Sequence, residues 1–286
     1  YEIGSGLVGS EMCIRDRLSI MQKGKNMARI YPLFSSSKGN SSFLGNPSAG
    51  ILIDAGASFK KLCGALDRCG IEIGAVKGVF ITHSHSDHVK GLKTLTAKTG
   101  IPVFGQCETL CELVKKELIS PCSEIYELDC PAAVAGMEVS CFDTPHDTVR
   151  SCGYRVSFED GRTCAVCTDL GHVTKTVDEN ILGCDLVLLE SNYDENMLKN
   201  GPYPYYLKER ILSASGHLSN KCCAGQARRL ISRGTTRIVL GHLSQENNTP
   251  QTAEKTVLSG LSEFKRDMDY ILKVAPVETD GEAVVF

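Results

Sequence analysis

Three histidines and an aspartate fall within six residues of this chain, directly after the apolar run at residues 79–81. In an extended segment successive side chains alternate between two faces, so His83 and His85 point the same way at a strand tip. Asp87 and His88 follow where the chain turns into a new element, and they face a second point. Imidazole and carboxylate ligands together favour Zn²⁺, Mn²⁺ or iron over Ca²⁺, which prefers oxygen ligands. The segment therefore predicts a strand that ends at a metal site with room for two ions.

Apolar strand patterns and amphipathic helical patterns follow one another from Ala28 onward. We expect strands at 29–34, 51–54, 78–82, 137–142, 152–158, 163–168, 186–190 and 237–241. We expect helices at 59–69, 89–99, 107–118, 176–182, 205–213, 221–233 and 250–264. No linker rich in Pro, Gly and Ser divides these segments. A single α/β domain over residues 27–286, with two sheets packed face to face and helices outside, accounts for this order.

Residues 1–26 differ from the rest of the chain. They have neither strand nor helix periodicity, and they lack the apolar stretch and small-residue cleavage site of an export signal. They resemble translated sequencing-adapter text, and Met27 stands directly before the first strand pattern. We expect residues 1–26 to be a non-native or disordered leader without a role in function.

Composition narrows the class of protein. The 31 basic and 34 acidic residues nearly balance, so the net charge of the chain does not indicate a nucleic-acid partner. The 14 cysteines are expected to be reduced thiols, many of them acting as small apolar residues. No segment reaches the roughly 18 apolar residues of a membrane span. We expect a cytoplasmic protein that does not associate with membranes.

Polar residues at the ends of later strands complete the set of metal ligands. His146, Asp169 and His242 each come shortly after an expected strand, where α/β proteins tend to build their sites. Asp54 ends another apolar strand and is placed to brace a ligand from behind. Taken singly, each of these residues is explained as a turn or cap residue. The recurrence of a polar group at the tips of apolar strands predicts one shared site.

In this order the residues resemble the five motifs of the metallo-β-lactamase superfamily, over nearly the whole chain after Met27. The resemblance implies a four-layer αβ/βα sandwich with two divalent metal ions, Zn²⁺ or Mn²⁺, at one edge of the sheets. It implies that one metal binds His83, His85 and His146, that the other binds Asp87, His88 and His242, and that Asp169 bridges them. Water shared by two cations has a lowered pKa and supplies a hydroxide nucleophile.

Two segments between Asp169 and His242 favour phosphodiester chemistry. Glu190 ends an apolar strand pattern, and His217 lies in the segment Gly-His-Leu-Ser-Asn. They resemble the acidic residue and the mobile-loop histidine that nucleases such as ribonuclease Z carry in this interval. Phosphodiester hydrolysis expels an alkoxide, which needs an acid or a cation, so His217 oriented by Glu190 would assist the leaving oxygen. The alternative is that His217 caps the next helix, but Ser219 serves that purpose.

The interval from Glu190 to His217 is too short for a β-CASP insertion, and the tRNA-gripping arm of ribonuclease Z is not evident. The chain is similar instead to the compact YycJ (WalJ) type, which implies 5′→3′ exonuclease action on DNA. Catalytic roles then fall to Glu190, to His217 and to Asp87 as an acceptor of the proton of the attacking water. The Ser/Gly/Asn-rich loop at 36–41 would offer backbone N–H groups to a phosphate. Residues expected to contact substrate are Ser37, Asn40, Lys221, Arg228, Arg229, Asn247 and Asn248, with the alternative for Asn247 and Asn248 that they only shape their loop.

The sequence thus predicts a dinuclear, metal-dependent phosphodiester hydrolase, and the resemblance to the YycJ (WalJ) type implies DNA rather than RNA as its substrate. The first alternative is a small-molecule hydrolase with the same ligands, such as a cyclic phosphodiesterase or a lactonase. A narrow, uncharged cleft would favour that alternative, and an open cleft lined by Lys and Arg would favour the nuclease. The second alternative is a regulatory protein with a vestigial metal site, against which the complete ligand set argues.

Overall fold

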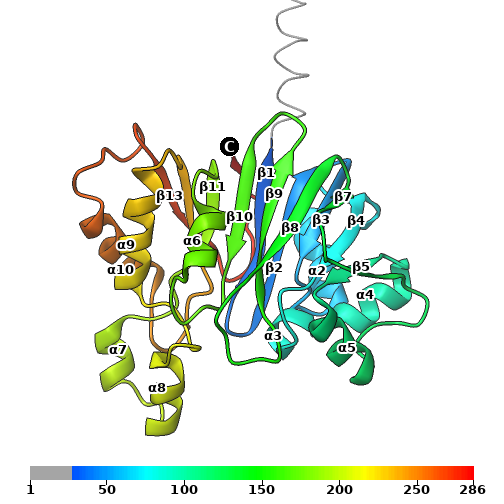
Figure 1. The fold of residues 1–286 in the computed structure, drawn as a ribbon, viewed down its shortest axis with the longest axis horizontal. Helices are drawn as coiled ribbons and strands as arrows, with labels where there is room; N and C mark the ends of the chain where they lie inside the picture. Colours follow the sequence, from blue (N-terminus) through cyan, green and yellow to red (C-terminus); the bar gives the residue numbers. More distant parts are fainter. Residues whose placement is uncertain (1–27) are drawn as a thin grey trace, which may run out of the picture.

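The computed structural model describes residues 28–286, so the leader predicted at 1–26 lies outside the described residues. Two seven-stranded mixed sheets pack face to face, and helices cover the outer face of each sheet (Figure 1). The αβ/βα sandwich expected from the sequence is therefore confirmed. Among the described residues no helix has both the length and the apolar character to cross a bilayer. All the cysteines in this part of the chain are free thiols.

The first sheet has the strand order β14-β1-β2-β3-β4-β5-β6. Its strands are β1 (Arg29–Ser36), β2 (Gly39–Asn46), β3 (Ala49–Ile53), β4 (Val76–Phe80), β5 (Val103–Gly105), β6 (Ile125–Glu127) and β14 (Val284–Val285). Strands β1 to β3 pair antiparallel, and β3 to β6 pair parallel. The helices that follow these strands are α2 (Phe59–Arg68), the 3₁₀ helix η1 (Ile73–Ala75), α3 (Ser86–Val89), α4 (Leu92–Thr99) and α5 (Cys107–Lys115).

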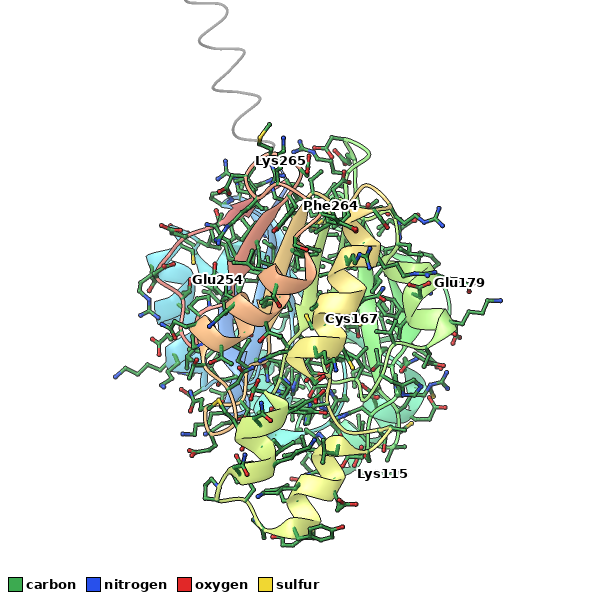
Figure 2. The ribbon with its side chains drawn as sticks, turned by 90° about the vertical axis from the view of Figure 1, so that its left-hand side faces the viewer. Lys115, Cys167, Glu179, Glu254, Phe264 and Lys265 are labelled. Carbon is green, nitrogen blue, oxygen red and sulfur yellow. The ribbon has the colours of Figure 1, made fainter. Side chains whose placement is uncertain are left out.

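The second sheet repeats this plan in the order β13-β12-β11-β10-β9-β8-β7. Its strands are β7 (Ala132–Val134), β8 (Met137–Asp143), β9 (Cys152–Phe158), β10 (Thr163–Cys167), β11 (Leu186–Glu190), β12 (Arg237–Gly241) and β13 (Ile271–Val274). Its helices are α6 (Lys175–Ile181), α7 (Glu195–Asn200), α8 (Tyr205–Leu212), α9 (Asn220–Ile231) and α10 (Pro250–Gly260). Figure 2 faces this side, where α9 and α10 cover the sheet and Cys167 belongs to the core beneath them, while α7 and α8 project at the lower edge.

The central strands are buried on both faces, and their side chains alternate between two cores. In β3, Ile51 and Ile53 point into the core between the sheets, and Leu52 points into the core under the helices. In β12, Val239 faces the other sheet and Leu240 faces the helices. Polar residues are few inside strands that are buried on both faces. The first polar residues after the strands therefore emerge together at one edge of the sandwich.

All eight strands predicted from the sequence are present, with ends within two residues of the prediction. The prediction of a loop at 36–41 is wrong, because Ser36 and Gly39 pair across a two-residue turn that joins β1 to β2. The helix predicted at 89–99 begins earlier and is divided into α3 and α4. The break lies at Gly91, whose N–H leaves the helical ladder and donates to the carbonyl of Ala55 at 2.8 Å.

Candidate metal centre

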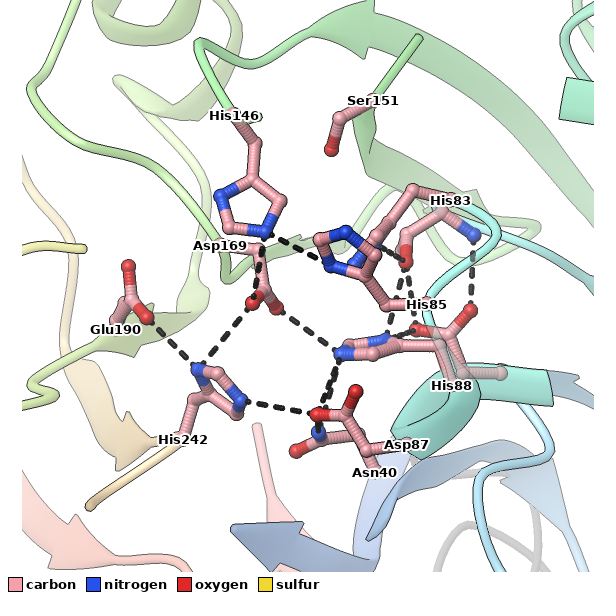
Figure 3. Close-up of polar contacts among 12 residues, drawn as sticks. Asn40, His83, His85, Asp87, His88, His146, Ser151, Asp169, Glu190 and His242 are labelled. Carbon is pink, nitrogen blue, oxygen red and sulfur yellow. Dashed lines mark hydrogen bonds and ion pairs between the residues drawn. The ribbon is translucent and has the colours of Figure 1, made fainter. Parts of the chain in front are cut away.

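The seven predicted metal ligands lie together in one cluster at this edge, which we call the metal cluster (Figure 3). It consists of His83, His85, Asp87, His88, His146, Asp169 and His242. Their ligand atoms fall into overlapping groups, within each of which all atoms lie within 4.8 Å of one another. The structure thus brings together residues that are up to 159 positions apart in the chain, from His83 to His242.

The first group joins His83, His85 and His146. The Nε2 atom of His146 lies 3.2 Å from Nδ1 of His85. The ring of His146 is held from behind, because its Nδ1 lies 3.1 Å from the carbonyl oxygen of Gly216. The Nδ1 atom of His83 lies 3.0 Å from the hydroxyl of Thr82. These outer contacts fix the rings and turn the opposite nitrogen of His83 and of His146 toward the cluster.

The second group joins Asp87, His88 and His242. The Nε2 atoms of the two histidines lie 3.5 Å and 3.6 Å from the same oxygen, Oδ2 of Asp87. On their far side each ring meets a buried carboxylate. The Nδ1 atom of His88 lies 2.8 Å from Asp54, and that of His242 lies 2.8 Å from Glu190. Both rings are therefore fixed by a carboxylate, an arrangement that orients histidine ligands in metal sites.

Asp169 lies between the two groups. One of its oxygens is 3.2 Å from Nε2 of His88, and the other is 3.4 Å from Nδ1 of His242 and 3.7 Å from Nε2 of His146. The side chain is 2% exposed. A carboxylate in this position is within reach of ligands from both groups, as a bridging ligand must be.

The charges of the metal cluster oppose and balance one another. Burial lowers the pKa of His83 well below its usual value, which keeps this imidazole neutral and able to bind a metal. Burial alone would raise the pKa of Asp169, but His242 and His88 outweigh it and hold that pKa well below its usual range. Burial also opposes the charge on His88, yet Asp169 and Asp54 raise its pKa. Protons and metal ions therefore compete for the same imidazole nitrogens.

The donor set fits divalent metal ions. The buried Nε2 atoms of His83 and of His242 have no hydrogen-bond partner within residues 28–286. A buried polar atom without a partner costs about 1–3 kcal/mol, so its presence calls for an explanation. Coordination of a metal by these nitrogens supplies one. Imidazole and carboxylate donors suit Zn²⁺ and Mn²⁺.

Glu190 and His217 also meet as the sequence predicts. The Nδ1 atom of His217 lies 2.8 Å from Oε1 of Glu190, and the same oxygen contacts His242. The second oxygen of Glu190 accepts hydrogen bonds from the backbone N–H groups of Leu170 and Leu218, at 2.9 Å and 3.1 Å. Helix α9 is capped by Ser219, whose hydroxyl accepts from the N–H of Cys222, so His217 is not needed as a cap.

Glu190 and His217 are also close enough to Asp169 and His242 to form a metal-binding group of their own. The hydrogen bonds of Glu190 argue against a ligand role. A carboxylate has about four acceptor positions, and four contacts already occupy those of this fully buried side chain. Burial would raise its pKa, but His217 and His242 lower that pKa to about 2. We therefore treat Glu190 as the residue that orients His217 and His242.

His217 lines a cavity of about 150 Å³ beside the metal cluster. Ser37 lines the same cavity, together with Asn192, Arg210 and Ser244. The guanidinium of Arg210 binds Asp147, the neighbour of His146. The cavity is small, and its one cation is already paired with a carboxylate. The charge of this cavity therefore does not distinguish between a nuclease and a small-molecule hydrolase.

The remaining predicted substrate contacts are dispersed. Arg228 and Arg229 bind Glu263 and Asp178 at 2.7 Å and 2.6 Å. Because a helix rises about 1.5 Å per residue, they lie roughly 12 Å beyond the start of α9. Lys221 is exposed in the first turn of that helix. The structure does not bring these three side chains into the metal cluster.

The three asparagines expected to contact substrate have different surroundings from one another. The amide nitrogen of Asn40 lies 3.2 Å from Oδ2 of Asp87 and 3.1 Å from Nε2 of His88, so Asn40 borders the metal cluster. Asn248 donates to the carbonyls of Ser191 and Asn192 and shapes its loop. The amide group of Asn247 is buried and has no hydrogen-bond partner in the described chain.

Sequence reasoning missed three polar residues that support the ligands. Thr82 donates its backbone N–H to Asp54, Ser35 accepts the N–H of His242 at 2.8 Å, and Asn192 donates to the carbonyl of His242 at 2.9 Å. Ser35 and His242 are 207 residues apart. Such contacts depend on the packing of the two sheets and carry no local signal in the sequence.

Left-handed backbone places three of the polar side chains at the strand ends. The φ angles of Asp54, Asp169 and His242 are 61°, 59° and 53°. Each residue follows a buried strand by one or two positions. Residues other than glycine seldom adopt this conformation, and it is concentrated at functional sites. The turn lets the chain leave the strand while the side chain stays over the strand end.

Close backbone contact fixes the motif that carries Asp87. A Cβ atom added to Gly56 would lie 1.7 Å from the carbonyl oxygen of Asp87 and 2.5 Å from the N atom of Asn40. The N–H of Gly56 donates to the carbonyl of Asn40 at 2.8 Å. Only glycine allows these three backbone segments to meet here. The segments after β3 and β4 and the start of β2 thereby form one wall of the metal cluster.

Replacement of Asp54 by asparagine is expected to weaken metal binding by about 10- to 100-fold while every ligand remains. The amide cannot accept the Nδ1–H of His88 with the same charge, and its NH₂ group favours the wrong ring tautomer. The measurement is a competition titration of the metal-free protein against a chelator of known affinity. The control is Asp67→Asn on the exposed side of α2. Unchanged affinity in Asp54→Asn would show that His88 does not depend on this brace.

Comparison with known proteins agrees with this architecture. A family model described as the beta-lactamase superfamily domain matches residues 50–243. The chain is 31% identical over 252 residues to the exodeoxyribonuclease WalJ of Streptococcus pneumoniae serotype 2 (strain D39 / NCTC 7466), which covers 87% of this chain and 93% of that protein. It is 33% identical over 233 residues to the exodeoxyribonuclease YycJ of Bacillus anthracis, which covers 81% of this chain and 88% of that protein.

Solved structures show the same fold. The metallo-beta-lactamase fold protein YhfI from Bacillus subtilis superposes with a TM-score of 0.68 at 14% identity, over 92% of this chain and 100% of that one. This likeness concerns the fold alone, whereas the family model and the relatives above 30% identity concern the family. The chain belongs to the beta-lactamase superfamily, within the group of metallo-β-lactamase-fold proteins that includes YycJ and WalJ.

Proposed function

We propose that the chain is a metal-dependent exodeoxyribonuclease that degrades DNA in the 5′→3′ direction. The observation that carries this proposal is the cluster of buried and half-buried His and Asp side chains in a chain whose relatives are named exodeoxyribonucleases. The proposal includes two ions, Zn²⁺ or Mn²⁺. His83, His85 and His146 would hold one of them, Asp87, His88 and His242 would hold the other, and Asp169 would be shared. It also includes a cytoplasmic location, where the DNA substrate is found.

When bound, divalent ions at this site lower the pKa of water and neutralise charge on a phosphate. The side chains supply the remaining steps. Asp87 is partly exposed, at 22%, and can accept the proton of the attacking water. His217 turns Nδ1 toward Glu190, which leaves Nε2 on the opposite side of the ring. From there Nε2 can donate a proton to the oxygen that departs from phosphorus, which makes the alkoxide a better leaving group.

Other hydrolases with this fold differ from the proposed nuclease in the substrate on which they act. A cyclic phosphodiesterase or a lactonase would use the same ligands, and no feature of the described residues favours either one. A regulatory protein with a relic site would need no complete cluster, and the closeness of all seven expected ligand side chains supports the enzyme instead.

The test is an exonuclease assay on the purified protein, stripped of metal and then restored with Mn²⁺ or Zn²⁺. The substrate is double-stranded DNA with a 5′-phosphate on one strand and an internal label, and the Asp87→Ala variant is the blank. Progressive release of mononucleotides from the 5′ end is the expected result, and it also identifies the metal. Intact DNA under both metals, with turnover of a cyclic phosphodiester or a lactone, would transfer the assignment to the small-molecule class.

A further inference from the structure

A second cavity lies beside the metal cluster, with a volume of about 230 Å³. We call it the lysine cavity. It is bordered by the β1–β2 turn, the start of α2 and the connection from α3 to α4, and its lining includes Ser36, Lys38, Gly56, Ser58, Lys61 and Lys90. None of these residues is a predicted metal ligand. The lysine cavity also shares no lining residue with the cavity that His217 lines.

The lysine cavity is positively charged. Its three lysines come from three different segments, and the ammonium groups of Lys38 and Lys90 have no ion-pair or hydrogen-bond partner within residues 28–286. The one carboxylate in the lining belongs to Glu278. It lies 4.0 Å from Lys61, and it also binds Arg68 at 2.5 Å. Two cations thus remain without a counter-charge, and they face a concave space.

The wall of the lysine cavity is also the wall of the metal cluster. Gly56 lines the cavity, and its backbone is packed directly against that of Asp87. Lys90 is two residues beyond His88, and Gln245, which also lines the cavity, is three residues beyond His242. An anion in the cavity would therefore lie one layer of backbone away from the metal ligands.

We propose that the lysine cavity binds a phosphate group of the DNA strand that is held at the metal cluster. This inference rests on the proposed function and adds a substrate contact to it. Lysine ammonium groups are common phosphate ligands, and each can form charge-assisted hydrogen bonds. The phosphate is either the 5′-terminal group or a group within the strand. Comparison of an oligonucleotide that has a 5′-phosphate with one that lacks it distinguishes the two.

The experiment measures binding rather than cleavage. Fluorescence anisotropy follows a single-stranded oligonucleotide with nuclease-resistant phosphorothioate linkages, carrying either a 5′-phosphate or a 5′-hydroxyl, on the Mn²⁺-loaded full chain. The variants are Lys38→Gln, Lys90→Gln and the double variant. The control is Lys60→Gln, because Lys60 is an exposed lysine in α2, next to Lys61, and does not line the cavity.

The double variant is expected to bind the oligonucleotide about tenfold more weakly than the unchanged protein. The slope of log affinity against log salt is expected to become shallower by about 0.7, because the contact with one phosphate of a single strand is lost. A loss confined to the phosphorylated oligonucleotide identifies the terminal phosphate, and an equal loss on both identifies an internal one. Either result supports the proposal. Affinity and salt slope equal to those of Lys60→Gln would overturn it.

The inference and the proposed function fail in different ways. If the protein binds DNA through the lysines but releases no nucleotides, the function is wrong and the phosphate site stands. If the protein degrades DNA and the lysine variants bind it normally, the function stands and the phosphate site is wrong. Thermal unfolding of each variant confirms that the comparison concerns folded protein.

Discussion

A protein carrying Asp169→Ala is expected to lose its metal ions and its activity together. Among residues 28–286, Asp169 is the one carboxylate within 3.7 Å of nitrogens from three histidines of the metal cluster, His88, His146 and His242. The substitution removes a carboxylate that is within reach of both groups. It also removes the negative charge that lies beside the clustered imidazole rings. Metal ions stabilise the transition state by several kcal/mol, and loss of this stabilisation corresponds to at least about a 1,000-fold fall in turnover. Metal content by mass spectrometry and the exonuclease assay measure the two effects.

The matched control is Asp160→Ala, which removes a surface carboxylate from its ion pair with Arg162, in the turn between β9 and β10. It is expected to keep both the metal and the activity. If Asp169→Ala retained two equivalents of metal after dialysis, Asp169 would not be a shared ligand. The two groups of ligands would then have to be complete without it.

A protein carrying His217→Ala is expected to keep its metal content and to lose DNA hydrolysis by about 100- to 10,000-fold. His217 is held by Glu190 at 2.8 Å but is not among the predicted metal ligands. Its proposed task is to protonate the leaving oxygen. A phosphodiester with a nitrophenyl leaving group needs no such proton, so its hydrolysis is expected to fall far less than that of DNA.

This difference between substrates separates acid catalysis from a structural role. A variant with a distorted site would lose both reactions equally, and such a result would contradict the assignment. His172→Ala serves as the control, since His172 is exposed and the other six of the seven histidines belong to the metal cluster or to the pair with Glu190. Metal analysis of both variants shows whether the cluster is intact.

The positions of the clustered His and Asp side chains were predictable from the sequence because most of them follow an apolar, largely buried strand. A strand such as β12 excludes polar side chains, so the position of His242 directly after it signals the sheet edge. Strand β2 gave no such signal. Its polar residues Ser41 and Ser42 are buried, and the hydroxyl of Ser41 donates to the carbonyl of Asp54. A strand whose polar groups are satisfied by distant partners does not show apolar alternation.

The substrate contacts were harder to predict for another reason. A cluster of basic residues in the sequence does not reveal which of them are already paired, and Arg228 and Arg229 bind Glu263 and Asp178. The lysines that remain unpaired beside the metal cluster come from separate segments and form no cluster in the sequence. Their convergence depends on the packing of the β1–β2 turn against the segments that follow β3 and β4.

The left-handed backbone of Asp54, Asp169 and His242 limits which substitutions these positions tolerate. A residue with a side chain costs on the order of 1 kcal/mol or more in this conformation, and glycine relieves most of that cost. At Asp169 and His242, glycine would remove a side chain of the metal cluster. At Asp54, glycine would leave the backbone N–H of Thr82 and the ring of His88 without their buried acceptor, at a cost of about 1–3 kcal/mol for each group. The residue that best suits the backbone is therefore excluded here by the side-chain contacts.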